Sequence, residues 1–274
     1  GVVIVEEGTY VVDGSSNLSI SVPSNVTLIG RGNTIITVQS DDPAFKNDDQ
    51  TNGDERIVIS GFKVVADRSS SSTYYDHLID FLYTKNCIIE KCTLIVKRPG
   101  SSSAGIRLYG SSSNKAEGNI ITENTISGFE SNEGPYTGIE LYQYCERNVI
   151  SSNTVFHCRE NLSIKASSQY NIICNNVIRD SDSSGSYGGI YVHESNYNTI
   201  TVNESISNKY GIYLRESSYC SVQYNVCKSN SVDGIRVGGD SSTDAEKNSV
   251  VGNVAVSNSQ VGINLAQYAK YNAV

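Results

Sequence analysis

The chain has 274 residues and a formal net charge of −8 at pH 7, with abundant glycine and tyrosine and neither methionine nor tryptophan. The negative charge argues against a nucleic acid as the partner of the whole surface. No apolar stretch is long enough to cross a membrane as a helix, so we expect no transmembrane segment. The balance of glycine and polar residues is typical of a turn-rich all-β protein.

Short runs of alternating apolar and polar residues fill the first part of the chain, residues 1–66. Such alternation predicts strands with one buried and one exposed face. The clearest runs are residues 2–12, 25–32 and 57–66, and turn residues separate them. We interpret residues 1–66 as the first coils of the fold.

A polar segment with six acidic residues, 41–55, interrupts these coils. Carboxylates in a loop are ligands that Ca²⁺ prefers, so a calcium site is one interpretation. A solvated acidic loop is the other, and we favour it. We expect no cofactor beyond this calcium alternative.

A two-part repeat organises residues 78–274. Its first half reads Gly-Ile-x-Leu or Gly-Ile-x-Val, and its second half reads Asn-x-Ile/Val-x-x-Asn. The first half begins at Gly105, Gly138, Gly189, Gly211, Gly234 and Gly262, with a degenerate copy at Asn161. The second half begins at Asn119, Asn148, Asn171, Asn198 and Asn248, with cysteine at asparagine positions in variants at Cys87 and Cys220.

The repeat returns about every 22 to 23 residues where no insertion lengthens it, as between Gly189, Gly211 and Gly234. A fixed period of this length is typical of a solenoid, in which no unit can bury its apolar face alone. Three short strands and three turns per period predict an all-β, right-handed parallel β-helix. A leucine-rich repeat has a similar period, but leucine is sparse here and no helical segment is evident.

The asparagines of the repeat have a structural explanation. A side-chain amide both donates and accepts hydrogen bonds, so asparagines stacked on successive coils can bond to one another and to the turn backbone. The seven cysteines contain no CxxC cluster, and we interpret them as small inward thiols within the same stacks. A metal site built from aligned cysteines is the alternative.

These motifs resemble those of the pectin-lyase-like superfold of right-handed parallel β-helices, and within it the NosD-like repeat proteins. The resemblance rests on the repeats from Gly105 to Val274, and residues 2–12 and 25–32 are similar to the first coils of that superfold. It implies the fold but not one activity, because this architecture carries lyases, hydrolases, epimerases and binding modules. The Asp-Pro-His-Asp motif of the alginate epimerases of the superfold is absent.

We interpret the chain as a single β-helix domain, residues 1–274. Gly1 opens directly on a predicted strand, and Val274 falls inside a repeat. Because a solenoid needs caps on its terminal coils, we expect this chain to be a fragment of a longer protein with further domains.

The strand of the first half offers two outward positions per coil. In Gly-Ile-x-Leu-x the isoleucine and leucine face the core, so both x positions are expected to face solvent. The first column is Asp80, Arg107, Glu140, Ser163, Tyr191, Tyr213, Arg236 and Asn264, and the second is Leu82, Tyr109, Tyr142, Lys165, His193, Arg215, Gly238 and Ala266.

Stacked coils turn these columns into a surface of aromatic rings and charged groups. We predict that it binds an extended acidic polysaccharide, because tyrosine supplies flat apolar area while arginine and lysine bind carboxylate or sulfate. The predicted substrate-binding residues are Arg107, Tyr109, Tyr142, Tyr191, Tyr213, Arg236 and Asp80. The column is expected to be locally basic, and the insertions at residues 130–137 and 180–187 are expected to wall a groove beside it. A merely solvated strand face is the alternative.

Catalysis, if present, is expected where titratable groups cluster, at Glu140, Lys165, His193 and Arg215. A lyase or C5-epimerase acting on a uronic-acid polymer needs a cation for the sugar carboxylate and a base for the C5 proton. Lys165 and Arg215 suit the first role and His193 the second, with Tyr142 or Tyr191 as the proton donor. Glycoside hydrolysis is the weaker interpretation, because Arg107 lies between Asp80 and Glu140 in the column.

Three functions therefore remain open from the sequence. The first is polysaccharide binding by an extracellular or cell-surface protein. The second is a polysaccharide lyase or epimerase. The third is a structural surface spacer or a NosD-like accessory protein.

Overall fold

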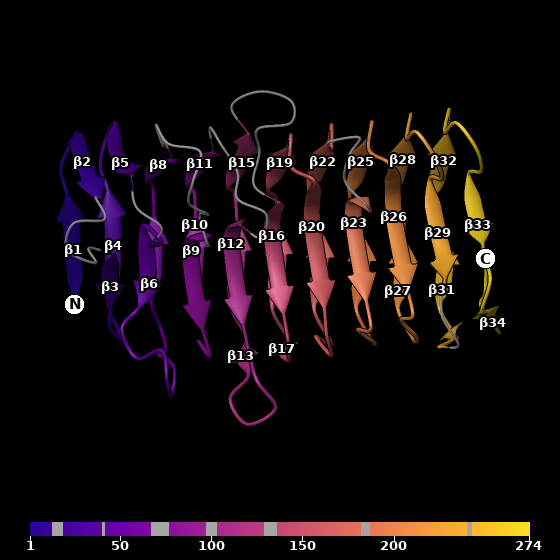
Figure 1. The fold of residues 1–274 in the computed structure, drawn as a ribbon, viewed down its shortest axis with the longest axis horizontal. Helices are drawn as coiled ribbons and strands as arrows, with labels where there is room; N and C mark the ends of the chain where they lie inside the picture. Colours follow the sequence, from indigo (N-terminus) through magenta and orange to yellow (C-terminus); the bar gives the residue numbers. More distant parts are fainter. Residues whose placement is uncertain are drawn as a thin grey trace.

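The computed structural model describes residues 1–12, 19–39, 42–66, 77–96, 103–128, 136–181, 187–239 and 243–274. Over these residues the chain winds into a parallel β-helix with no α-helix, and the predicted fold class is confirmed. Three sheets of ten strands each run along the solenoid, and Figure 1 shows the coils stacked in chain order from the N-terminus to the C-terminus. Within the described ranges, no helix is long and apolar enough to span a membrane.

Each complete coil contributes one strand to sheet A, one to sheet B and one to sheet C. Sheet A contains β1 (Val2–Val5), β4 (Thr27–Gly30), β7 (Val58–Ser60), β10 (Ile88–Glu90), β14 (Ile120–Thr122), β18 (Val149–Ser151), β21 (Ile172–Cys174), β24 (Thr199–Thr201), β27 (Ser221–Gln223) and β31 (Ser249–Val251). Sheet B contains β2 (Gly8–Val12), β5 (Thr34–Val38), β8 (Lys63–Ala66), β11 (Thr93–Val96), β15 (Thr125–Gly128), β19 (Thr154–Phe156), β22 (Val177–Arg179), β25 (Glu204–Ile206), β28 (Val226–Lys228) and β32 (Val254–Val256).

Sheet C is formed by the Gly-Ile-x-Leu half of the repeat. It contains β3 (Ile20–Val22), β6 (Phe45–Asn47), β9 (His77–Leu82), β12 (Ala104–Tyr109), β16 (Thr137–Tyr142), β20 (Glu160–Lys165), β23 (Gly188–His193), β26 (Tyr210–Arg215), β29 (Ile235–Gly238) and β33 (Ile263–Leu265). Two short pairs complete the structure, β13 (Ala116–Glu117) with β17 (Cys145–Glu146) and β30 (Ala245–Glu246) with β34 (Ala269–Lys270).

The core consists of aliphatic side chains stacked in register from coil to coil. Ile139 pairs with Ile106 on one side and with Leu162 on the other, and all three are fully buried. Because every strand is parallel and in register, like side chains meet across each 4.8 Å step, roughly the spacing of neighbouring strands. Columns of isoleucine, leucine and valine therefore fill the interior, and sheet C contributes two of them, one through Ile139 and one through Leu141.

Two ladders of buried asparagine flank sheet A, and they confirm the structural role that the repeat predicts. Asn148 is typical: its Nδ2 donates to Asn171 Oδ1 at 3.0 Å and to the Ala116 carbonyl at 3.0 Å. Its Oδ1 accepts from both the backbone N and Nδ2 of Asn119 at 2.9 Å. Each amide thereby satisfies turn backbone that the coil buries.

A third, shorter ladder follows sheet B and was not predicted. Asn208 N donates to Asn230 Oδ1, and Asn230 N donates to Asn258 Oδ1 in the next coil. Asn161 Nδ2 reaches Asn208 Oδ1 at 2.9 Å, so the degenerate repeat at Asn161 joins this ladder. The substitution of asparagine for glycine there is explained by this contact.

The glycine of the repeat is required by the close approach of neighbouring coils. A Cβ on Gly138 would lie 2.3 Å from Val155 Cγ1 and 2.4 Å from the Asn161 carbonyl oxygen. A Cβ on Gly211 would lie 2.4 Å from the Gly234 carbonyl oxygen. Contacts this short do not occur, so a side chain at Gly138 or Gly211 would force the neighbouring coils to shift.

The cysteines are free, and six of the seven are buried. Three of them occupy asparagine positions as predicted: the backbone nitrogens of Cys87, Cys92 and Cys220 donate to the side-chain oxygens of Asn119, Asn124 and Asn248. These thiols act as small members of the ladders, which supports the structural interpretation.

The acidic segment, in its described residues 42–55, uses two of its carboxylates to hold its own backbone. Asp54 accepts hydrogen bonds from the backbone nitrogens of Ser24 and Asp49, and Asp49 accepts from those of Thr51 and Asn52. Residue 41 lies outside the described residues. In the described part of the chain, the one group of His, Cys, Asp and Glu able to hold a metal ion lies elsewhere, so the calcium site remains a prediction without structural support.

Candidate functional site on sheet C

The outer face of sheet C aligns the two predicted columns residue by residue. Asp80 pairs with Arg107, and Arg107 pairs with Glu140. The first column continues through Ser163, Tyr191, Tyr213, Arg236 and Asn264. The second column runs through Leu82, Tyr109, Tyr142, Lys165, His193, Arg215 and Gly238. The predicted stacking is therefore confirmed over eight coils for the first column and seven for the second.

The expectation that both columns face solvent is wrong for much of the first column. Tyr191 and Tyr213 are each only 2% exposed, and Asp80 and Ser163 are also buried. The side chains do point away from the core, but other side chains cover them. Tyr187 stacks on Tyr191 with ring centroids 4.1 Å apart, and Tyr210 contacts Tyr213 at 5.1 Å.

Arg215 ties this tyrosine cluster together. Its Nη1 donates to the hydroxyl of Tyr187 at 2.6 Å and to that of Tyr191 at 3.4 Å. Burial raises the pKa of Tyr191, so its hydroxyl stays protonated. The insertions that were expected to wall a groove lie largely outside the described residues, at 130–135 and 182–186, but Tyr187 at the end of one of them packs directly on the face.

A second group of tyrosines remains partly exposed. Tyr83, Tyr109 and Tyr142 form a row on successive coils, with ring centroids 5.9 and 5.8 Å apart and planes inclined at 65° and 44°. Tyr109 OH donates to Gln143 Oε1 at 2.9 Å. Because the rings are inclined rather than stacked face to face, they do not cover one another completely. We refer to these three residues as the tyrosine row.

An ion pair lies beside the tyrosine row. The guanidinium of Arg107 donates from Nε and Nη2 to the two carboxylate oxygens of Asp80 at 2.8 and 2.9 Å. The same guanidinium lies 5.4 Å from the ring centroid of Tyr109. This bidentate ion pair fixes the orientation of the Arg107 guanidinium.

Three charged groups meet in the middle of the face. Lys165 Nζ lies 2.6 Å from Glu160 Oε2 and 3.6 Å from Glu140 Oε1. Burial raises the pKa of Glu140, although Lys165 acts against it. For Lys165, burial would lower the pKa, but the carboxylates of Glu160 and Glu140 outweigh it and the pKa is raised. Lys165 thus bridges the carboxylates of Glu160 and Glu140.

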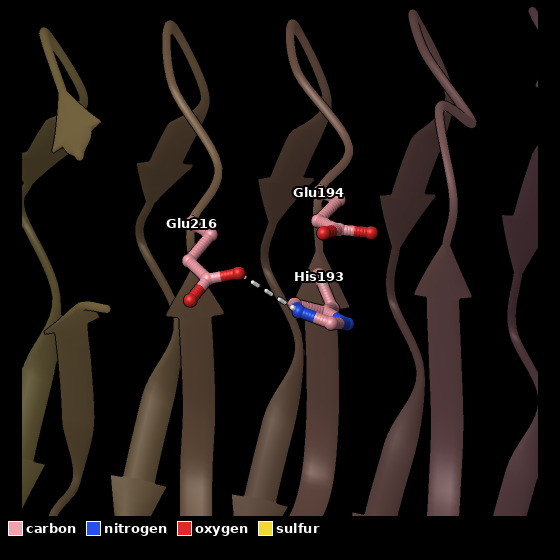
Figure 2. A group of neighbouring side chains, drawn as sticks. All are labelled: His193, Glu194 and Glu216. Carbon is pink, nitrogen blue, oxygen red and sulfur yellow. Dashed lines mark hydrogen bonds and ion pairs between the residues drawn. The ribbon is translucent and has the colours of Figure 1, made fainter. Parts of the chain in front are cut away.

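Histidine and two carboxylates form the next cluster toward the C-terminus, shown in Figure 2. His193 Nε2 lies 3.2 Å from Glu216 Oε2, and Glu216 Oε1 lies 3.9 Å from Arg215 Nε. Glu194 stands beside His193 on the same coil, and one ligand atom from each of His193, Glu194 and Glu216 falls within 4.8 Å of the others. The sequence interpretation did not include Glu194 or Glu216.

The last charged group is built around Asp233, which is fully buried. Its Oδ2 accepts from Arg236 Nη1 at 3.4 Å and from Asn264 Nδ2 at 2.9 Å, and its Oδ1 accepts from the backbone of Val261. Arg236 also lies over the rings of Tyr210 and Tyr213 at 5.5 and 5.4 Å. Arg236 is thus engaged in holding two coils together.

The expectation of a locally basic face is wrong for the described residues. The two predicted columns contain four lysine and arginine side chains, Arg107, Lys165, Arg215 and Arg236, and each lies within 4.0 Å of a carboxylate. The carboxylates on or beside the columns are Asp80, Glu140, Glu160, Glu194, Glu216 and Asp233. Four of these six carboxylates lie outside the two predicted columns. The prediction of a basic face therefore included the cations but not most of the carboxylates that pair with them.

With this geometry in view, the chain can be compared with known proteins. The family model described as periplasmic copper-binding protein (NosD) matches residues 130–274, more than half of the chain. The chain belongs to the NosD family. No curated protein matches this NosD-family chain.

Solved structures share the fold of this NosD-family chain at low sequence identity. DFA-IIIase from Arthrobacter chlorophenolicus A6 has a TM-score of 0.65 at 13% identity, over 92% of this chain and 65% of that one. The A-module of the mannuronan C-5 epimerase AlgE4 from Azotobacter vinelandii has a TM-score of 0.59 at 11% identity, over 100% of this chain and 91% of that one. The tailspike of E. coli bacteriophage HK620 has a TM-score of 0.65 at 15% identity, over 100% of this chain and 57% of that one. At these identities the likeness shows the fold alone.

The family description names copper, so the donor groups of this NosD-family chain can be tested against that metal. Cu(I) prefers thiolate and thioether ligands. The sequence has no methionine, and burial raises the pKa of all seven cysteine thiols, which disfavours thiolates. The cysteines therefore do not fit a Cu(I) site, whereas the imidazole and carboxylates of His193, Glu194 and Glu216 are ligands for a divalent ion.

Proposed function

We propose that the outer face of sheet C binds a polysaccharide chain. The observation that carries this proposal is the tyrosine row, with partly exposed rings repeated at 5.9 and 5.8 Å along the solenoid axis. Each inclined ring offers its own apolar surface with a polar hydroxyl, and three such rings in a row suit the apolar faces of successive sugar rings. The row runs in the direction in which an extended polymer would lie.

Charged groups beside the row supply the polar half of such a site. The Asp80–Arg107 pair and the Glu140–Lys165 pair present fixed donors and acceptors next to Tyr109 and Tyr142. Sugar hydroxyl groups both donate and accept, so they can bond to either member of a pair without breaking it. A positioned array of this kind favours recognition of a repeated polyol.

The balance of charge bears on the class of polymer. The expectation of an acidic polysaccharide rested on an excess of cations, and the described carboxylates remove that excess. A sugar carboxylate would have to displace Asp80 from Arg107, or Glu160 from Lys165. Uncharged polysaccharides therefore join the uronic-acid polymers as candidates.

The compartment follows from the family. NosD proteins are described as periplasmic, and we propose that this chain also works outside the cytoplasm, in the periplasm or at the cell surface. Polysaccharides of the envelope would be within reach of sheet C in either place.

Turnover is the second candidate, and one observation favours it. Burial raises the pKa of Glu140, which lies 3.6 Å from Lys165, so a carboxyl group and a cation stand side by side on the proposed binding face. An elimination or epimerisation at a uronic acid would use such a pair to neutralise the sugar carboxylate and to move a proton. His193, the predicted base, lies on the coil that follows Lys165.

The experiment is a binding screen against acidic and neutral polysaccharides, followed by ultraviolet detection of unsaturated products. Wild-type protein is expected to bind at least one polymer, and Tyr109→Ala is expected to weaken that binding by about 10-fold, the effect of losing about 1.4 kcal/mol. Product that forms in wild type and is lost in Glu140→Gln would add turnover. Absence of binding to every polymer would reject the proposal and leave the structural spacer.

A further inference from the structure

We propose that His193, Glu194 and Glu216 form a binding site for one divalent transition-metal ion of the Zn²⁺ type. The three ligand atoms come from two neighbouring coils and lie within 4.8 Å of one another. Figure 2 shows the imidazole of His193 and the carboxylate of Glu216 directed toward one another, with Glu194 alongside. This inference goes beyond polysaccharide binding and does not rest on it.

The first two ligands are joined by a hydrogen bond, and their spacing is also compatible with a metal site. Zn²⁺ binds imidazole nitrogen and carboxylate oxygen at about 2.0 to 2.2 Å, so two ligands of a tetrahedral ion lie about 3.4 Å apart. His193 Nε2 and Glu216 Oε2 are 3.2 Å apart. An ion can therefore insert between them with a shift of only a few tenths of an ångström.

The third ligand has the freedom to complete the site. Glu194 is exposed, while His193 is half-buried and Glu216 is buried. Glu194 lies in the left-handed region of backbone conformation with φ of 48°, directly after the strand that ends at His193. A change in its side-chain torsions can close the remaining distance without disturbing the sheet.

Burial and charge favour a cation at this position. The side chain of Glu216 is only 5% exposed, and a carboxylate at such a depth needs a positive partner. Arg215 approaches its Oε1 at 3.9 Å, whereas Oε2 faces His193. Two carboxylates, a neutral imidazole and the neighbouring Arg215 guanidinium leave a net charge of −1, so a cation is still electrostatically favoured at this position.

The donor set indicates which ions bind. One nitrogen and two carboxylates suit Zn²⁺, Mn²⁺ or Cu²⁺, and among these the affinity of a given site rises toward Cu²⁺. Ca²⁺ takes six to eight oxygen ligands, roughly twice as many as the cluster supplies, so it is expected to bind poorly. With three protein ligands, the ion would keep an open position for water on the surface of sheet C.

Isothermal titration calorimetry with ZnCl₂ tests the site in the intact chain, with CaCl₂ as the comparison cation. Wild type is expected to bind one equivalent of Zn²⁺, and each of His193→Gln, Glu194→Gln and Glu216→Gln is expected to weaken binding by more than about 10-fold. His157→Gln and Glu204→Gln replace the same residue types elsewhere on the solenoid and are expected to leave binding unchanged.

Glu194→Gln is the decisive variant because its exposed side chain cannot affect folding. Zn²⁺ binding that survives Glu194→Gln and His193→Gln, or that is lost in His157→Gln instead, would overturn the assignment. The same holds if wild type binds no Zn²⁺ and its thermal midpoint does not rise with added ZnCl₂, since any ion that binds the folded state must stabilise it. Metal binding without polysaccharide binding would leave this inference intact.

Discussion

Glu160 and Lys165 form a short ion pair within a single strand of sheet C, with Glu160 Oε2 2.6 Å from Lys165 Nζ. Their side chains are only 2% and 17% exposed. The pair sits at the centre of the proposed binding face, where Glu140 provides a second carboxylate at 3.6 Å from the same Nζ. The contribution of this buried ion pair to the stability of the fold can be compared with that of an exposed ion pair elsewhere on the solenoid.

Replacing Glu160 by glutamine is expected to lower the stability of the fold by about 1 to 3 kcal/mol. The amide cannot compensate the buried ammonium, and only the more distant Glu140 remains. Chemical denaturation of wild type and Glu160→Gln measures the change.

Glu117 provides a matched control, because its Oε1 also lies 2.6 Å from a cation, Nη1 of Arg147. Those side chains are 37% and 60% exposed. Glu117→Gln is therefore expected to cost less than about 1 kcal/mol. Equal losses for the two variants would mean that burial does not set the strength of the Glu160–Lys165 pair.

The stability of the protein is expected to fall on mild acidification because of His77. Burial, followed by repulsion from Arg107, lowers the pKa of His77 from 6.5 to about 3, and its Nδ1 accepts a hydrogen bond from the backbone of Ala104 at 3.0 Å. The unfolded chain takes up a proton below pH 6.5 while the folded chain does not, so stability is lost as the pH falls from 6.5 toward 3. The loss is expected to reach about 1 kcal/mol between pH 7 and 5.5.

His77→Asn replaces the titrating imidazole by an amide, whose oxygen can still accept the hydrogen bond from the backbone nitrogen of Ala104. Denaturation of the variant between pH 7 and pH 5.5 is expected to depend less on pH than that of wild type. The same pH dependence in both proteins would show that His77 is already protonated or is not linked to folding.

Cys220 interrupts an asparagine ladder, and Cys220→Asn is expected to stabilise the fold by about 1 kcal/mol. Asn198 Nδ2 now donates only to the carbonyls of Ser168 and Ser195, whereas Asn171 Nδ2 bonds to the side-chain oxygen of the next asparagine. An asparagine at position 220 would supply that oxygen. The midpoint of thermal unfolding measures the gain.

Cys227→Asn is the comparison, because Cys227 is fully buried in the aliphatic core rather than in a ladder. An amide there would lack partners, so this substitution is expected to lower the midpoint. Two shifts of the same sign would argue against the ladder as the reason that asparagine recurs at this position.

The stacking of sheet C could be predicted because the Gly-Ile-x-Leu motif marks the same strand in successive coils and strand side chains alternate strictly. Those two rules place Arg107 beside Glu140 and Tyr109 beside Tyr142 without any coordinates. The same rules explain why asparagine columns were predicted correctly. The recurring motif therefore predicts the register even where an insertion lengthens the coil, as between Gly105 and Gly138.

The carboxylates of the site could not be predicted in this way. Glu194 and Glu216 follow the last strand residue of their coils, where the backbone turns left-handed with φ of 48° and 51°. Alternation assigns no direction to a side chain at such a turn. Glu160 is the first residue of β20, one position before the degenerate repeat at Asn161, and lies outside the two outward positions that the repeat defines.

The burial of the tyrosines was missed for a related reason. Tyr191 points outward as alternation requires, but Tyr187 covers it, and Tyr187 follows an insertion whose path no repeat determines. A ring on a strand surface is available to a ligand only if no inserted segment folds over it. The tyrosine row meets this condition, and the Tyr191 and Tyr213 pair does not.

The most direct test of the proposed function takes a polysaccharide that the wild-type protein binds and measures its affinity for two double variants. Tyr109→Ala with Tyr142→Ala removes two rings of the tyrosine row. Tyr170→Ala with Tyr197→Ala removes two exposed rings outside the strands of sheet C. These rings stack face to face with their centroids 5.1 Å apart. We predict that the first pair abolishes binding and that the second leaves the affinity unchanged. Equal losses in both variants, or unchanged affinity in the first, would contradict a binding face on sheet C.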